Sequence, residues 1–130
     1  MERSAVQRWV DELFDSWKTG DAARAASLFS VDAVYRSHPF RDPARGRSEI
    51  ADYWQQASQT QTAMDLHVGS PIVDGDRVAV EWWVSLTENG IDSVSTGTLF
   101  LTFGDGLCTS LREVWTEQPG RKTPYPGWGR

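Results

Sequence analysis

Residues 78–103, VAVEWWVSLTENGIDSVSTGTLFLTF, contain two strand-like runs on either side of an Asn-Gly pair. From Val78 to Val84 every second residue is bulky and apolar, which is the period of a half-buried β-strand. Asn89-Gly90 is typical of a two-residue hairpin turn, because both residue types tolerate positive φ angles. The stretch therefore predicts two long antiparallel strands joined by a tight turn.

The Asn89-Gly90 turn also predicts a register for this hairpin. The predicted pairs are Val80 with Leu99, Val78 with Leu101, and Trp82 with Gly97. A three-residue loop over 104–106 extends the sheet to a third strand, and there the predicted pairs are Leu99 with Leu111 and Gly97 with Glu113. One carboxylate, that of Glu113, is then expected on a face rich in apolar side chains.

The other face of the same strands has a different character. The predicted register places Glu81, Thr98 and Arg112 in one row there, which is an ordinary surface arrangement of charges. Trp83, Ala79 and Phe100 are also expected on this outer face. Exposed aromatic rings on one face favour an interface, so the sequence predicts a homodimer formed through the outer sheet face.

The amino-terminal half has a helical period. Apolar residues recur every three or four positions from Val6 to Trp17, which predicts a helix to about Thr19 that ends at Gly20. Asp21 is expected to cap a short second helix. A strand over 33–37 and a third helix from Gly46 follow, and the buried residues expected on that helix are Ile50, Tyr53, Trp54 and Ala57.

This order predicts the α+β class, with three amino-terminal helices packed on a curved, mainly antiparallel sheet. We expect one domain over residues 1–130, and an irregular tail over 118–130, where prolines and glycines accumulate.

Composition narrows the choice of partners. The net charge of −5 and the pI near 4.9 argue against a nucleic-acid backbone as the main partner. Cys108 is the lone cysteine, so no internal disulfide or cysteine-rich metal site is expected. No apolar run approaches the roughly 18 to 20 residues that span a bilayer, and the first helix is unlike a signal peptide. We expect no membrane partner and a cytoplasmic location.

The 22 residues AVYRSHPFRDPARGRSEIADYW, 33–54, contain a histidine and four aromatic residues, and they run from the first predicted strand into the third predicted helix. Together with the seven tryptophans of the chain they indicate an apolar pocket. The candidate proton-transfer residues are His38, because imidazole titrates near neutral pH, and Glu113. The candidate ligand-binding residues are Tyr35, Phe40, Trp54, Trp82, Leu99, Leu111 and Trp115.

Each candidate has a structural alternative. His38 would also be suited to capping a turn before Pro39, and Glu113 to being a buried structural acid with a hydrogen-bond partner. Tyr35 would lie either in the pocket or on the outer face of its strand. The arginines between 36 and 47 are suited either to an anionic ligand group or to local ion pairs with nearby acids.

The sequence offers no sign of a bound cofactor. It lacks a phosphate-binding glycine loop and a serine-nucleophile motif, and two histidines do not suffice for a multi-histidine metal centre. We therefore expect no cofactor and no metal.

Several of these features together resemble the nuclear transport factor 2-like superfamily, and in particular its SnoaL-like branch of small cone-shaped proteins. The resemblance covers residues 5 to 117. The resemblance rests on the following motifs: Gly20-Asp21, Leu28-Phe29 before Asp32-Ala33, His38-Pro39, Gly46 with Ile50 and Tyr53-Trp54, and the Phe103-Gly-Asp-Gly turn before Leu111-Arg-Glu-Val-Trp115. The superfamily includes ketosteroid isomerases, polyketide cyclases, epoxide hydrolases and dehydratases beside many non-catalytic domains.

The resemblance to ketosteroid isomerases assigns roles to single positions. His38, before Pro39, corresponds to their acidic proton-transfer residue, and Trp115 to a pocket-lining position. Their enolate-stabilising tyrosine and aspartate correspond to Leu13 and Leu99. The resemblance therefore implies a pocket without that oxyanion hole, and a chain that is not a ketosteroid isomerase.

Two functions are open at this point. The first is a SnoaL-like protein that binds a small apolar or cyclic molecule and isomerises, cyclises or dehydrates it without a cofactor, with proton transfer by His38 and Glu113. The second is a non-catalytic ligand-binding or dimerisation module. Shared fold alone does not decide between them.

Overall fold

The computed structural model describes residues 1–130 and contains three helices and seven strands. The helices are α1 (Arg3–Thr19), α2 (Ala22–Ser27) and α3 (Gly46–Thr60). The strands are β1 (Phe29–Arg36), β2 (Ala44–Arg45), β3 (Gln61–Val68), β4 (Ile72–Asp74), β5 (Arg77–Glu88), β6 (Ile91–Gly104) and β7 (Leu107–Pro119). The predicted order of helix, helix, strand and helix before a β-meander is confirmed.

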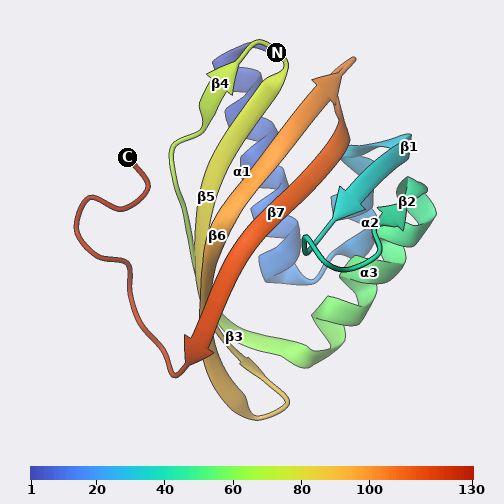
Figure 1. The fold of residues 1–130 in the computed structure, drawn as a ribbon. Coiled ribbons are helices and arrows are strands. Elements are labelled where there is room, and N and C mark those ends of the chain that lie inside the picture. The colour runs from blue at the N-terminus through green and yellow to red at the C-terminus, as the bar shows by residue number, and fades with distance from the viewer.

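All strands belong to one curved sheet, in the order β2-β1-β7-β6-β5-β3, with β4 also paired to β5. Only the pairing of β1 with β7 is parallel. The three helices lie on one side of this sheet, and the carboxy-terminal segment runs along the other side (Figure 1). The expected α+β class, with helices on a mainly antiparallel sheet, is confirmed.

The helical end signals act as the sequence predicts. Gly20 has a φ of 73° and ends α1, and the side chain of Asp21 accepts a hydrogen bond of 3.1 Å from the backbone N–H of Arg24 at the start of α2. The inner stripe of α1 is completely buried at Val6 and Val10. These features fix α1 and α2 as a helical layer over the sheet.

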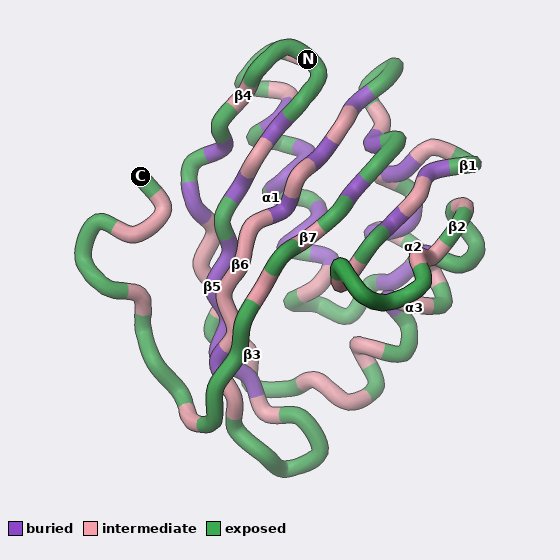
Figure 2. The backbone as a smooth tube through the Cα atoms, viewed as in Figure 1, coloured by how far each residue is buried: buried purple, intermediate pink, exposed green.

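The register predicted for β5 and β6 is confirmed. Val80 lies opposite Leu99, Val78 opposite Leu101 and Trp82 opposite Gly97. Buried and more exposed positions alternate from Val78 to Trp82 on β5 and from Leu99 to Phe103 on β6, whereas β5 is buried on both faces from Trp82 to Leu86 (Figure 2).

The register predicted for β6 and β7 is wrong by two residues. Glu113 lies opposite Leu99, Leu111 opposite Leu101 and Trp115 opposite Gly97. The turn has two residues rather than three, because Asp105 adopts a φ of 53° beside Gly106, and this shifts the pairing by one residue. A bulge between Thr102 and Phe103 shifts the pairing by one residue more. A shift of two preserves the alternation of faces, so Glu113 still lies on the inner side.

In the predicted outer-face row, the pairing of Glu81 with Thr98 is confirmed, and the place of Arg112 beside Thr98 is wrong because of the same shift. Thr98 lies opposite Val114, and Arg112 lies opposite Phe100. The guanidinium carbon of Arg112 is 4.7 Å from the centroid of the Phe100 ring. This cation–π contact covers one of the aromatic rings expected to be free on this face.

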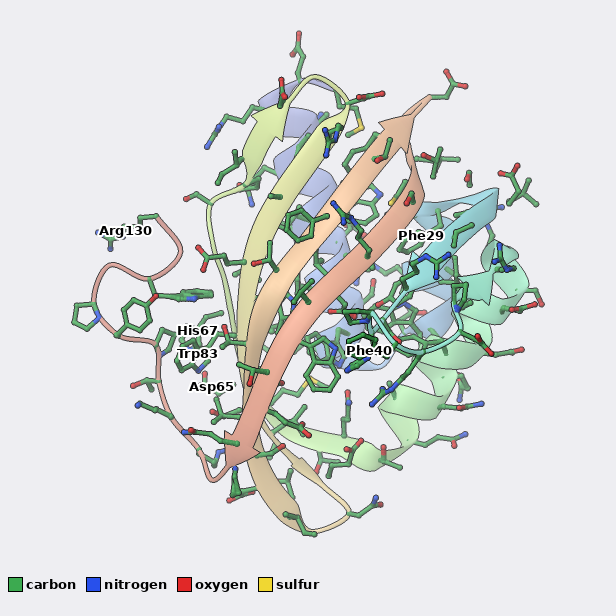
Figure 3. All side chains as sticks on the ribbon, in the orientation of Figure 1. Phe29, Phe40, Asp65, His67, Trp83 and Arg130 are labelled. Atoms are coloured by element: carbon green, nitrogen blue, oxygen red, sulfur yellow. The ribbon has the colours of Figure 1, made fainter.

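The carboxy-terminal segment 120–130 covers a second aromatic ring of the outer face, that of Trp83. The indole N–H of Trp83 donates a 2.7 Å hydrogen bond to the backbone oxygen of Lys122, and the rings of Tyr125 and Trp128 pack edge-on against it. Trp83 is 8% exposed although it points away from the helices, toward the tail (Figure 3). Residues 120–130 form no helix or strand and lie on the outer face, whereas residues 118 and 119 still belong to β7. None of the helices has the length and apolar character needed to cross a membrane.

Candidate functional site

A cavity of about 430 Å³ lies between the helices and the inner face of the sheet. Side chains from α1, β1, α3, β5, β6 and β7 line it. Its aromatic lining residues are Phe14, Trp17, Tyr35, Tyr53, Trp54, Trp82 and Trp115. The volume lies in the usual range of small-molecule sites, which are mostly apolar with a few placed polar groups.

The tryptophans pack edge to face with one another. The ring centroid of Trp17 is 5.8 Å from that of Trp82 and 6.1 Å from that of Trp54. The indole N–H of Trp17 donates a 2.7 Å hydrogen bond to the side-chain oxygen of Gln61, whereas the buried indole N–H groups of Trp54 and Trp82 have no partner. These contacts fix the orientation of the rings that form the cavity wall.

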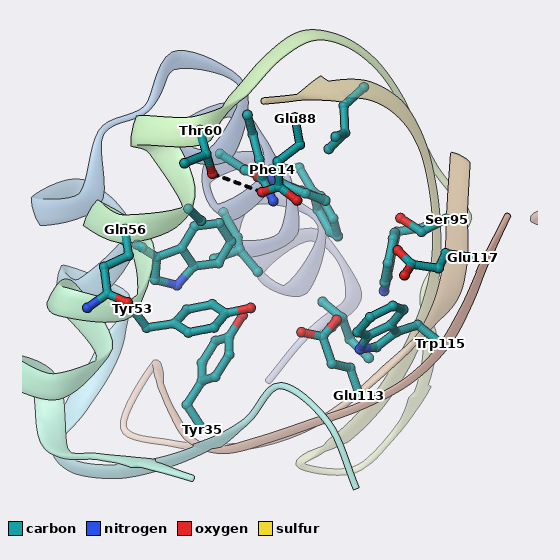
Figure 4. A pocket seen from close by; sticks show the side chains of 18 of the residues that line it. Phe14, Tyr35, Tyr53, Gln56, Thr60, Glu88, Ser95, Glu113, Trp115 and Glu117 are labelled. Atoms are coloured by element: carbon teal, nitrogen blue, oxygen red, sulfur yellow. Dashed lines mark hydrogen bonds between the residues drawn. The ribbon is translucent and has the colours of Figure 1, made fainter. Parts of the chain in front are cut away.

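Glu113 is the carboxylate among these rings. It extends from β7 opposite Leu99, and its side chain points into the pocket toward Tyr35 and Tyr53 (Figure 4). Burial raises its pKa from the ordinary value of 4.5 to about 8. The carboxyl group therefore exchanges its proton close to neutral pH, as a general acid or base must.

Two tyrosines lie beside this carboxyl group. The ring centroids of Tyr35 on β1 and Tyr53 on α3 are 5.0 Å apart, and their hydroxyl groups point toward each other (Figure 4). Burial, and next the charge of Glu113, raise the pKa of Tyr35 well above its usual value and that of Tyr53 to about 12. Both hydroxyl groups therefore remain protonated near neutral pH, as hydrogen-bond donors.

Trp115 connects the cavity to the 37–43 loop. Its indole N–H donates a 2.7 Å hydrogen bond to the backbone oxygen of Ser37, and the guanidinium carbon of Arg41 is 5.8 Å from its ring centroid. The ring of His38 packs edge-on against Trp115 at 5.6 Å. The Nδ1 atom of His38 accepts a 3.1 Å hydrogen bond from the backbone N–H of Phe40, which is a turn-capping contact.

The structure brings together six of the nine residues proposed from the sequence. Those that line the cavity are Tyr35, Trp54, Trp82, Leu99, Glu113 and Trp115. Leu111 is in the core with no exposed surface, and Phe40 is 93% exposed. His38 is not among the lining residues, although it touches one of them.

Other lining residues were not recognised as such in the sequence. Tyr53 was expected only to be buried, and Trp17 only to face inward from α1. Both belong to inward helical stripes, and a pocket-lining residue has the same period as a core residue. Glu88 and Glu117 also line the cavity, at strand ends where side-chain alternation gives no sign of a ligand site. No group of three His, Cys, Asp or Glu side chains is arranged to hold a metal ion.

The family model for the SnoaL-like domain matches residues 10–111. The chain belongs to the SnoaL-like domain family. The match spans α1 through most of the sheet and includes Tyr35, Tyr53 and Leu99. A search of curated proteins found no relative of this SnoaL-like chain.

Solved structures share the fold of this SnoaL-like protein. A putative scytalone dehydratase from Novosphingobium aromaticivorans matches with a TM-score of 0.78 and 15% identity, over 98% of this chain and 93% of that one. SalBIII, an epoxide hydrolase/cyclase-like enzyme with a role in pyran ring formation in the polyether salinomycin, matches with a TM-score of 0.77 and 19% identity, over 88% and 95%.

A third match is a hypothetical protein from Catenulispora acidiphila in complex with trimethylamine, with a TM-score of 0.75 and 17% identity, over 82% of this chain and 83% of that one. Its fold is described as ketosteroid isomerase-like. These likenesses establish the fold, and the expected nuclear transport factor 2-like, SnoaL-like architecture is confirmed.

Proposed function

We propose that this SnoaL-like protein is a cofactor-independent enzyme that isomerises, cyclises or dehydrates a small ring-containing molecule by proton transfer at Glu113. The observation that carries the proposal is the position of the Glu113 carboxyl group inside an aromatic cavity of about 430 Å³, where burial raises its pKa to about 8. A carboxyl group of this kind removes a proton from carbon more readily than one in water, because its anion is less well solvated.

The tyrosines supply the second part of the proposed mechanism. When Glu113 takes a proton from a carbon beside a carbonyl group, negative charge develops on the carbonyl oxygen. The hydroxyl groups of Tyr35 and Tyr53 remain protonated and stabilise that charge as hydrogen-bond donors. Glu113 then returns the proton to another carbon in an isomerisation, or to a departing hydroxyl group, which leaves as water in a dehydration.

The proposal gives His38 a positioning role. Its ring packs against Trp115, and its Nδ1 atom is engaged by the Phe40 N–H. The pairing of His38 with Glu113 that the sequence predicted is replaced here by the pairing of Glu113 with the two tyrosines.

Ring opening of 5-nitrobenzisoxazole provides a test that needs no knowledge of the natural substrate. A base removes the proton on carbon 3, the N–O bond breaks, and a coloured cyanophenolate forms. We expect turnover that rises with pH with a midpoint of about 8, as Glu113 ionises, and that exceeds that of Glu113→Gln by about 100-fold.

Two further variants complete this test. Glu81→Gln makes the same chemical change on the outer face and should keep the wild-type rate. Tyr53→Phe should lose about tenfold, because one donor to the developing phenolate is gone. Equal rates for the wild type and Glu113→Gln would refute the proposal.

The alternative of a non-catalytic ligand-binding or dimerisation module uses the outer sheet face. A homodimer through Trp83, Ala79 and Phe100 stays a prediction. The tail over Trp83 and the guanidinium over Phe100 leave less free apolar surface there than the sequence suggests. We therefore favour the enzyme.

A further inference from the structure

The end of the cavity remote from Tyr35 has two more carboxylates at its rim. Glu117 on β7 lies opposite Ser95, and Glu88 at the end of β5 accepts a 2.9 Å hydrogen bond from the hydroxyl of Thr60. Glu88, Ser95 and Glu117 surround this part of the pocket (Figure 4). This end is therefore rich in hydrogen-bond acceptors.

The charges at the cavity are not balanced by basic side chains. The acidic and basic side chains that line it are Glu88, Glu113, Glu117 and Arg41, and of the three acids Glu113 is the one whose raised pKa keeps it largely uncharged near neutral pH. The ion pairs of the protein all use other carboxylates, those of Glu12, Asp15, Asp65 and Asp92.

Two arginines, Arg41 and Arg121, make their contacts away from Glu88 and Glu117. Arg41 lies against Trp115, on the side of the 37–43 loop. Arg121, which follows β7, interacts with Asp92 and with the backbone oxygen of Ala63. The acidic rim is left without a positive partner.

The indole N–H groups of Trp54 and Trp82 give independent evidence that the cavity receives a ligand. Both side chains line the cavity and are more than nine-tenths buried, and neither N–H has a hydrogen-bond partner. Buried polar groups in proteins normally have such partners. A ligand is the partner that this cavity can admit.

The rings of the cavity wall also suit a positive charge. A cation over the face of an indole is attracted by the ring quadrupole, most strongly where water is excluded. Trp115 lies between Glu113 and Glu117 on the inner face of β7. The Cα atoms of these two glutamates are about 13 Å apart along the strand, so a ring system fits between the two ends.

We propose that the cavity selects ligands with a positively charged nitrogen at one end of an apolar ring system. The ammonium group lies at the rim beside Glu88 and Glu117, and the ring packs against Trp17 and Trp82. This leaves Glu113 free to exchange a proton at the other end. The inference rests on the proposed function and specifies its substrate class.

A pair of probes with the same shape tests this inference. Phenyltrimethylammonium and tert-butylbenzene differ in the charged nitrogen that replaces a carbon. Titration of the full chain, followed by tryptophan fluorescence, should give at least about tenfold tighter binding of the cation. Added salt should weaken binding of the cation alone.

Variants then locate the charge preference. The double variant Glu88→Gln/Glu117→Gln should lower the affinity for the cation at least about fivefold and keep the affinity for tert-butylbenzene, which also shows that the variant is folded. Glu81→Gln, the matched control on the outer face, should bind both probes as the wild type does.

The outcomes separate this inference from the proposed function. Equal binding of the two probes would overturn the charge preference and leave the proton-transfer proposal standing. An unchanged affinity of the double variant for the cation would do the same. Binding of neither probe would overturn both, because the proposed function requires a cavity that admits a small ring.

Discussion

Gly97 and Trp115 lie opposite each other on β6 and β7, so close that a Cβ atom on Gly97 would be 2.6 Å from the Cβ atom of Trp115. The same Cβ atom would be 2.3 Å from the backbone oxygen of Val114. The absence of a side chain at Gly97 thus permits the close approach of the two strands and sets the position of Trp115 in the cavity wall.

This contact predicts a cost for the smallest possible substitution. Gly97→Ala should lower the free energy of unfolding by about 1 to 3 kcal/mol, because the strands must separate to admit the methyl group. Urea denaturation measures the effect. Gly104→Ala is the matched control, since its Cβ atom would meet only the Thr109 methyl group, at 3.4 Å. Equal losses in the two variants would contradict the account.

The raised pKa of Glu113 predicts how stability depends on pH. Between its ordinary pKa of 4.5 and about 8 in the folded chain, the folded protein holds a proton that the unfolded chain has released. This contribution to stability is therefore complete below about pH 4.5 and is lost as pH rises to about 8, by up to about 4 kcal/mol.

Replacement of the carboxyl group should remove this dependence. Glu113→Gln should match the wild type near pH 4.5 and be the more stable protein at pH 8 to 9, as measured by urea denaturation at each pH. A constant difference between the two proteins over this range would show that Glu113 titrates as an exposed carboxyl group does.

The location of His38 predicts a small effect on proton transfer. His38→Ala should change the rate with 5-nitrobenzisoxazole by less than about threefold, because the ring contacts Trp115 and lies outside the cavity lining. A loss of 100-fold or more, the size expected for a proton-transfer group, would restore the catalytic role that the sequence suggested.

The tail predicts the behaviour of the outer face. Deletion of residues 120–130 should expose Trp83 and Val94, which are 8% and 4% exposed in the full chain. We expect a loss of about 2 to 4 kcal/mol in the free energy of unfolding and association at micromolar concentration, measured by sedimentation. The same deletion with W83K should remain monomeric. A truncated chain with unchanged stability and sedimentation would show that the tail protects nothing.

The fold was largely predictable from the sequence because its signals are local. Alternation from Val78 to Val84 and the Asn89-Gly90 turn determine the central hairpin and its register. The register predicted for the next hairpin is wrong because Asp105 occupies a left-handed position without being glycine, and because a bulge has no clear sequence signal. The inner face was still identified correctly, since the error was an even number of residues.

The site was predictable only where strand alternation reaches it. Glu113 and Trp115 follow from the period of β7, whereas the direction of His38 and Phe40 depends on an irregular loop held by its own hydrogen bonds. Tyr53 and Trp17 have the period of core residues, and only the packed helices leave a cavity beside them.

The central claim is that Glu113 exchanges its proton near neutral pH inside an aromatic cavity. The most direct measurement is a pH titration of the side-chain carboxyl carbons by NMR on labelled protein, with Glu113→Gln to assign the signal. We predict a midpoint of about 8 for Glu113. A midpoint near the ordinary value of 4.5 would contradict the account, because such a carboxylate would be solvated and the cavity would not be the apolar site described above.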